Sequence, residues 1–168
     1  MNNEIFKTIT GFNNYKISNL GNVKNLLTNK MLKSAVNVYG YLFVSLYNNG
    51  KTQQKRIHRL LGETFIENPL NKPFIDHIDH NRLNNNINNL RWADEKENSR
   101  NSTKRKNSSS KYRGVYYDNE KKRYRVKIYV NNRQEQIGYF NDENEAGEAY
   151  NKFARDIYKD FACLNIIT

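Results

Sequence analysis

The sequence predicts an α+β protein in which short antiparallel strands alternate with a few helices. Two patterns indicate this class. In the first third of the chain, alternating apolar and polar runs are separated by Asn-Gly and Leu-Gly turns, and near the C-terminus the same alternation precedes one long helical pattern. Apolar residues make up 37% of the 168 residues, which is below the usual share, so we expect several compact modules with thin cores.

The N-terminal segment, residues 1–56, has the pattern of β-hairpins. Apolar runs such as YKIS and GYLFVSLY are separated by NLGN and NNGK, in which Asn and Gly supply the backbone conformations of tight turns. A small antiparallel sheet is therefore predicted. Helical spacing from Ile57 to Phe65 then predicts a helix that ends before Pro69, and Leu83 to Trp92 is expected to carry a turn and another helix.

The C-terminal segment predicts three strands and one helix. The strands are YRGVYY, KKRYRVKIYV and RQEQIGYF, and the helix runs from Glu143 to about Tyr158, with Asp142 and Glu145 as a capping box. The apolar face of the middle strand should meet one helical stripe, formed by Ala146, Ala149, Tyr150, Phe153 and Ile157.

The stretch KRKNSSSK, residues 104–111, has the composition of a linker because it is basic, rich in serine and without apolar residues. We therefore predict an N-terminal module, a central core, a linker and a C-terminal module. Their ranges are 1–56, 57–101, 102–111 and 112–166.

The charge predicts a polyanionic partner. The net charge is +11 and the isoelectric point is about 9.7. Residues 111–140 carry eight basic and three acidic residues, whereas 141–160 carry three basic and six acidic ones. The predicted sheet is thus positive and the predicted helix negative, which favours a sheet that enters the major groove of DNA. A merely soluble basic protein is the alternative that charge alone leaves open.

Several classes of protein are disfavoured. No apolar run approaches the length of a membrane span and the N-terminus lacks a signal-peptide pattern, so we expect an intracellular protein without membrane contact. The single Cys163 and only three histidines argue against an internal disulfide framework and against a zinc finger.

The stretch FIDHIDHNRLNNNINNLRW, residues 74–92, holds the candidate chemistry. Asp76 and His77 end a short apolar segment, and on a strand their side chains would point to different sides of a bound phosphate. A carboxylate suits Mg²⁺, and a histidine ordinarily titrates near neutral pH and can take a proton from water. Asn89 and Asn98 offer amide oxygens, one able to orient the histidine ring and one able to complete a metal shell. These are the parts that phosphodiester hydrolysis needs.

Other interpretations of this stretch stay open from the residues alone. DHIDHN could be a polar turn, and His77 with His80 could be zinc ligands, although carboxylates and amides suit oxygen-preferring metals better. Asparagine occupies 29 of the 168 positions, a bias typical of an AT-rich genome, so most asparagines are expected to have no particular role.

The residues DHIDHNRLNNNINNLRW, followed by ENS, resemble the catalytic core of HNH homing endonucleases of phage type. That family has D-H-x-D, a spaced set of asparagines ending in N-L-x-W, and then E-N-S. The preceding RIHRLLGETFIENP is similar to the family's V-H-R-L-V-A-x-A-F-I-P-N-P, and the resemblance covers about 45 residues.

The resemblance implies a ββα-metal fold with assigned site residues. Asp76 would be a ligand of a catalytic divalent metal ion, Mg²⁺ in the first place with Mn²⁺ as the alternative. His77 would be the general base, Asn89 would take the place of the family's third motif residue, and Asn98 would be the second metal ligand.

Two further histidines are assigned to structural roles. His80 stands where the family often has glycine, so a substituted turn position is favoured over contact with phosphate. His58, from the H-R-L segment, is interpreted as a buried, hydrogen-bonded scaffold residue.

The flanking segments resemble DNA-binding modules. ITGFNNYKISNLGNVKNL is similar to a nuclease-associated modular motif that precedes HNH cores and is taken to help position DNA. Residues 112–165 resemble the APETALA/ethylene-response-factor DNA-binding domain, through YRGV, KRYRVKI, IGYF and EAGEAYNKFA. Tyr116, Asp118 and Gln136 replace residues that are usually Arg, Arg and Trp in the plant proteins, so sequence preference does not transfer. The predicted DNA-binding residues are Arg113, Arg123, Arg125, Lys127, Tyr129 and, in the linker, Lys104, Arg105 and Lys106.

The resulting prediction is a metal-dependent DNA endonuclease of the HNH homing type. It would hydrolyse phosphodiester bonds at an extended site of double-stranded DNA, as a monomer, in the cytoplasm of a bacterial host if a phage encodes it. A catalytically inert, sequence-specific DNA-binding regulator is the alternative from another class. A structured-RNA binder is the third, since twelve tyrosines could stack on bases.

Overall fold

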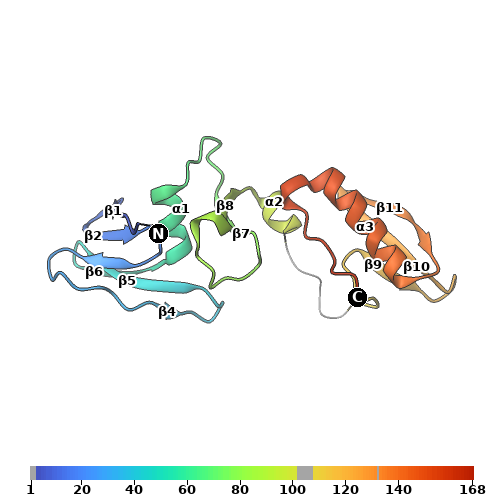
Figure 1. The fold of residues 1–168 in the computed structure, drawn as a ribbon, viewed down its shortest axis with the longest axis horizontal. Coiled ribbons are helices and arrows are strands. Elements are labelled where there is room, and N and C mark those ends of the chain that lie inside the picture. Colours follow the sequence, from blue (N-terminus) through green and yellow to red (C-terminus); the bar gives the residue numbers. More distant parts are fainter. Residues whose placement is uncertain (1–2, 102–107, 132) are drawn as a thin grey trace. The chain divides into compact units, whose positions relative to one another are not determined.

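The protein divides into two compact units, Met1–Glu95 and Lys96–Thr168 (Figure 1). The computed structural model describes residues 3–101, 108–131 and 133–168. The predicted DNA-binding residues Lys104, Arg105 and Lys106 lie outside these ranges, as does most of the predicted linker. Within the described ranges, no helix is long and apolar enough to cross a membrane.

The first unit begins with hairpins, as predicted, but their strands form two sheets. One sheet has the order β1-β2-β3 and the other β4-β5-β6, and both are antiparallel. The strands are β1 (Phe6–Ile9), β2 (Phe12–Ser18), β3 (Val23–Asn25), β4 (Ala35–Val36), β5 (Leu42–Asn48) and β6 (Lys51–Arg56). Between β5 and β6, Asn49 and Gly50 both have positive φ, which is the two-residue turn that matches strand twist.

The remainder of this unit consists of one helix, a strand pair and a short 3₁₀ helix. The predicted helix is confirmed as α1 (Ile57–Phe65). Strand β7 (Phe74–His77) pairs antiparallel with β8 (Leu90–Ala93), and η1 (Ile87–Asn89) leads into β8. The helix expected between Leu83 and Trp92 was wrong, because Trp92 lies in β8 opposite Ile75 and its Nε1 donates to the carbonyl of Ile66.

A single hydrophobic core extends through the first unit. It contains residues of β1, β2, β3 and β5 together with residues of α1, β7 and β8, so the predicted positioning module and nuclease core share one core. Gly62 allows α1 to approach β7, since a Cβ at this position would overlap the side chain of Ile75. The buried members of this hydrophobic core are Ile9, Phe12, Tyr15, Ile17, Val23, Val44, Leu46, Ile57, Leu60, Leu61, Ile75 and Leu90.

The second unit is a three-stranded antiparallel sheet packed on one long helix, as predicted. The sheet has the order β11-β10-β9, and its strands are β9 (Val115–Asp118), β10 (Arg123–Val130) and β11 (Arg133–Phe140). The unit also contains the short helices α2 (Glu95–Arg100) and η2 (Lys159–Phe161). The α+β class predicted from the sequence is therefore confirmed.

The long helix α3 (Glu143–Tyr158) begins where the capping pattern predicted. The carboxylate of Asp142 accepts hydrogen bonds from the backbone N–H groups of Asn144 and Glu145. Its buried stripe differs from the prediction: Phe153 is 42% exposed and Ala149 is half-buried, whereas Ala154 and Tyr158 are buried. The hydroxyl of Tyr158 donates to the carbonyl of Tyr129, which explains why the stripe follows this side of the helix.

Candidate active site

The predicted metal ligand and general base lie side by side at the end of β7. Asp76 is 8% exposed and His77 is 5% exposed. Asp76 lies directly opposite Arg91 of β8, and Arg91 donates from Nε and Nη2 to Oδ2 of Asp76 at 3.0 and 2.9 Å. This partly buried ion pair fixes the direction of the carboxylate, because a guanidinium fork holds an oxygen in one plane.

The ring of His77 is held by polar and aromatic neighbours. Its Nε2 lies 3.0 Å from Oδ1 of Asn85, which accepts hydrogen bonds, so Nε2 carries the proton. In the neutral ring this leaves the lone pair on Nδ1. The ring of His58 meets that of His77 edge to face, with centroids 5.0 Å apart, and the ring of Tyr41 lies 6.1 Å from it.

His58 is a buried scaffold residue, as interpreted from the sequence, and its contacts are aromatic. Its ring lies 4.8 Å from that of Tyr41 and it is 4% exposed. Its Nδ1 is buried and has no hydrogen-bond partner among the described residues, in contrast to the hydrogen-bonded state expected. Burial, reinforced by the positive charge of His77 when protonated, Arg56 and Arg59, lowers the pKa of His58 to about 3. His58 is therefore neutral near pH 7.

Asn89 stabilises the loop between β7 and β8. Its Oδ1 accepts from the backbone N–H of Asp79, and its Nδ2 donates to Oδ1 of Asp79 and to the carbonyl of Asn84. Asn84 also donates to Oδ2 of Asp79. Burial would raise the pKa of Asp79, but hydrogen bonds from Asn84, Asn81 and Asn89 together lower it. A catalytic role for Asn89 remains a prediction.

Several asparagines of this loop hold its backbone in shape, although most of the 29 asparagines in the chain were expected to have no particular role. Backbone N–H groups two residues further on donate to the side chains of Asp79, Asn81, Asn84 and Asn86, which gives two successive pairs of Asx turns. They shape the loop that carries Asn85 to His77.

His80 occupies a turn position in the same loop. Its φ is +62°, a left-handed conformation that favours glycine, and its backbone N–H donates to the carbonyl of His77. This conformation agrees with the assignment of His80 as a substituted turn residue.

The predicted metal ligands are of residue types that suit a hard cation. Among the described residues, no group of three or more His, Cys, Asp and Glu side chains could hold a metal ion. A carboxylate such as that of Asp76 and the amide oxygen of Asn98 are ligands that suit Mg²⁺, which needs few protein oxygens. Asn98 is exposed in α2 of the second unit, and its place in a metal shell remains a prediction.

The candidate DNA-binding residues of the second unit share one face of its sheet. Arg123, Arg125, Lys127 and Tyr129 alternate along β10 with residues that pack on α3. Lys127 donates to the side chain of Gln134 at 3.1 Å. Their partners on the neighbouring strands β9 and β11 lie on the same face of the sheet. These partners are Tyr116, Asp118, Gln134, Gln136 and Tyr139.

Arg113 differs from the other predicted DNA contacts because it is partly buried. Its Nη2 lies 3.4 Å from the carbonyl of Ser99, and its guanidinium interacts with the hydroxyl of Tyr150. Burial raises the pKa of Tyr150 to about 12, although Arg113 opposes the shift. Gly114 is required beside it, since its φ is +75° and a Cβ would overlap Tyr150.

Three residues at the site escaped the sequence analysis: Asn85, Arg91 and Tyr41. Arg91 could have been found by assuming that the segments around Ile75 and Trp92 pair as antiparallel strands. A register with Ile75 opposite Trp92 places Arg91 opposite Asp76. Nothing in the sequence distinguishes Asn85 from its asparagine neighbours, and Tyr41 comes from a distant hairpin.

Comparison with known proteins identifies the parts of the first unit. Residues 4–47 match the NUMOD4 motif, and residues 55–100 match the HNH endonuclease family. An uncharacterized HNH endonuclease of Acanthamoeba polyphaga mimivirus is 48% identical over 86 residues, which cover 51% of this chain and 26% of the relative.

Phage homing endonucleases are homologous to this chain over more than half of its length. The DNA endonuclease I-HmuI of Bacillus phage SP01 is 35% identical over 101 residues, which cover 60% of this chain and 58% of that protein. The H-N-H endonuclease F-TflII of Escherichia phage T5 is 37% identical over 89 residues, which cover 52% and 46%. The chain thus spans between 26% and 58% of the length of these three relatives.

A solved structure has a similar fold over 58% of this chain. That structure concerns DNA binding and cleavage by the HNH homing endonuclease I-HmuI. Its superposition on this chain has a TM-score of 0.54, with 35% sequence identity. The alignment covers 58% of this chain and 56% of that one.

Proposed function

We propose that this chain, which carries an HNH endonuclease core after a NUMOD4 motif, is a DNA endonuclease that hydrolyses phosphodiester bonds. The observation that carries the proposal is the buried pair Asp76 and His77, each held by its own partner, Arg91 and Asn85. Burying two such polar side chains is costly unless they are paired, and the contacts with Arg91 and Asn85 offset that cost. A carboxylate and an imidazole next to each other are the groups that metal binding and proton transfer require.

His77 is assigned as the general base. With Nε2 donating to Asn85, the lone pair on Nδ1 can accept the proton of a water molecule that attacks phosphorus. His58 supports this role because it is neutral and adds no positive charge that would disfavour proton uptake.

Asp76 and Asn98 are assigned as the ligands of a divalent metal ion, Mg²⁺ before Mn²⁺. Arg91 holds the carboxylate of Asp76 in position for this. When bound, such an ion would stabilise the negative charge that develops on the phosphate and the leaving oxygen. The chain's own residues hold the ligands and move the proton.

The second unit is assigned to DNA recognition. Its sheet presents Arg123, Arg125 and Lys127 on the face away from α3, and this supports a domain of the APETALA/ethylene-response-factor type whose sheet enters the major groove. Two DNA-binding units on one chain raise the effective concentration of the nuclease core, which suits an extended asymmetric site of double-stranded DNA bound by a monomer.

Cleavage of DNA tests the proposal directly. The purified chain is incubated with supercoiled plasmid and with genomic fragments in Mg²⁺ or Mn²⁺, with EDTA as the control. Nicked or linear product that disappears in EDTA is expected. Tight, specific binding without cleavage in either metal would contradict the proposal and indicate a DNA-binding regulator.

A further inference from the structure

A basic and aromatic cluster, formed by Arg56, Tyr41 and Arg82, lies beside the candidate base. The guanidinium of Arg56 is 5.0 Å from the centre of the Tyr41 ring, and that of Arg82 is 4.8 Å from it. The Tyr41 ring itself is 6.1 Å from the ring of His77. Three separate segments therefore bring two cations to one ring: the end of β6, the connection from β4 to β5, and the loop after β7.

The positive charge of this cluster is not balanced by the described residues. Arg56 and Arg82 are both exposed, and neither forms an ion pair with a carboxylate in the described ranges. Arg82 donates from Nη1 to the carbonyl of Tyr39 at 2.7 Å, which uses one of its five N–H donors. Two guanidinium groups on one ring repel each other, so an anion between or beside them would be bound favourably.

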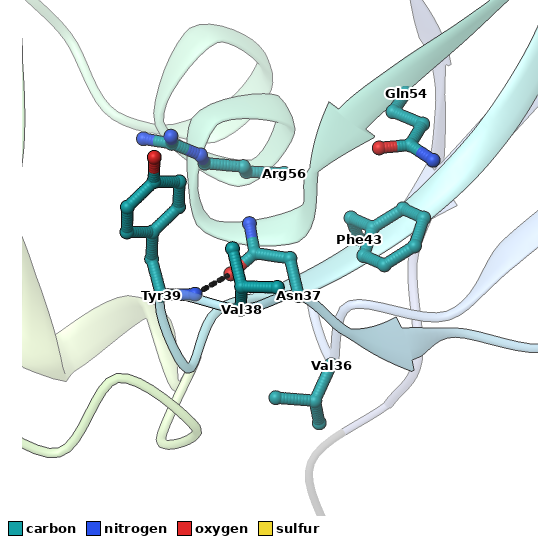
Figure 2. A pocket seen from close by; sticks show the side chains of 7 residues that line it. All are labelled: Val36, Asn37, Val38, Tyr39, Phe43, Gln54 and Arg56. Atoms are coloured by element: carbon teal, nitrogen blue, oxygen red, sulfur yellow. Dashed lines mark hydrogen bonds between the residues drawn. The ribbon is translucent and has the colours of Figure 1, made fainter.

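A pocket next to the cluster provides room for such a ligand. It has a volume of about 510 Å³, and Figure 2 shows Arg56 and Tyr39 on one side of it with Gln54 and Phe43 on the other. Asn37 at its base accepts a hydrogen bond from the backbone N–H of Tyr39, which holds the pocket wall in shape. The lining combines Val36 and Val38 with two aromatic rings, two amides and a guanidinium, so it offers both a stacking surface and polar contacts to a nucleotide.

We propose that Arg56 and Arg82 bind a backbone phosphate of the DNA strand next to the phosphate that His77 acts on. This inference rests on the proposed function and adds the binding site that would align the substrate strand. Arg guanidinium groups are well suited to phosphate because they donate two parallel hydrogen bonds. The Tyr41 ring contacts both arginines and also the rings of His58 and His77. A phosphate bound by the arginines would therefore lie close to the general base His77.

The salt dependence of DNA binding tests this assignment. The wild type, Arg56→Gln and Arg82→Gln are titrated onto one specifically bound fragment between about 50 and 200 mM salt, the range over which phosphate contacts are lost. Each substitution should reduce the slope of log affinity against log salt by about 1 and weaken binding by about tenfold. Lys51→Gln removes one positive charge at the far end of β6 and is the matched control, with little change in slope expected.

A purely structural role is tested by the same set of variants. Arg82 could simply join two loops through the Tyr39 carbonyl, and Arg82→Lys keeps the charge while it removes the guanidinium fork. Thermal unfolding shows whether a variant has lost its fold. If Arg82→Gln unfolds, Arg56→Gln tests the phosphate contact instead, because the Arg56 side chain donates no hydrogen bond within the described residues. Slopes of the arginine variants equal to that of Lys51→Gln would overturn the inference. A wild type that binds but never cleaves would overturn the proposed function instead.

Discussion

Arg91 donates two hydrogen bonds to the same oxygen of Asp76, across a directly opposed position of the β7–β8 pair. The two side chains are 16% and 10% exposed, so the ion pair is largely withdrawn from water. This contact thus links the two strands, fixes the direction of the carboxylate and balances its negative charge.

Arg91→Gln should lower both stability and cleavage. Loss of the guanidinium leaves the carboxylate of Asp76 without this partner, at a cost of about 1–3 kcal/mol in the free energy of unfolding. The metal concentration needed for half-maximal cleavage should also change, because the carboxylate is no longer held in one direction. Urea denaturation and a metal titration measure the two effects.

Glu63→Gln is the matched control for Arg91→Gln. It breaks the ion pair between Arg59 and Glu63, whose side chains are 38% and 48% exposed, and such surface pairs contribute less than about 1 kcal/mol. Equal losses of stability in both variants would count against a special role for the Asp76 contact.

Asn85→Asp should move the acidic limb of the pH–rate profile to higher pH. A carboxylate 3.0 Å from Nε2 of His77 favours the protonated ring, and a base that is already protonated cannot take a proton from water. The shift should be about 1 pH unit or more. Asn85→Ala adds no charge and should lower the rate without moving the limb; a limb that stays in place in Asn85→Asp would argue against His77 as the base.

His58 should make the fold sensitive to acid. Its pKa is about 3 in the folded chain, below the ordinary value of 6.5, so the unfolded chain binds more protons between these values. Stability is then highest above pH 6.5 and falls as the pH decreases towards 3. Relative to pH 7, this group should cost about 2 kcal/mol at pH 5. In His58→Gln the free energy of unfolding should depend less on pH over this window, and an unchanged dependence would show that other groups cause it.

His80→Gly should stabilise the protein without loss of cleavage. The left-handed backbone at His80 is unfavourable for a side chain, and its relief should outweigh the greater freedom of glycine in the unfolded chain by about 0.5–1 kcal/mol. Asn71→Gly, at another left-handed position, should gain less because asparagine tolerates this conformation. A more stable but inactive His80→Gly variant would instead assign His80 a contact with the substrate.

The regular parts of the fold could be predicted because their patterns are local. Helix α3, its Asp142 cap and the alternation along β10 follow from spacing and capping rules. Strand β8 could not be predicted, since Leu90 to Ala93 is only four residues long and its sequence fits a helix or a strand, so only its pairing with β7 decides.

The candidate site was predictable in part for a similar reason. Asp76 and His77 are neighbours in the chain and stand out by residue type, but their partners depend on tertiary contacts. Asn85 reaches His77 only because Asx turns and Asn89 shape the loop, and Tyr41 reaches it from another sheet. Composition suggested that most asparagines had no particular role, and it could not show which of them close Asx turns in this loop.

The central claim is that His77 takes a proton during cleavage of DNA. The most direct test compares single-turnover cleavage by the wild type and by His77→Ala, on one bound fragment, with protein in excess and Mg²⁺ present. We predict that His77→Ala binds the fragment with unchanged affinity and cleaves it at least about 100-fold more slowly. Equal cleavage rates for the two proteins on fully bound DNA would contradict the assignment of His77 as the general base.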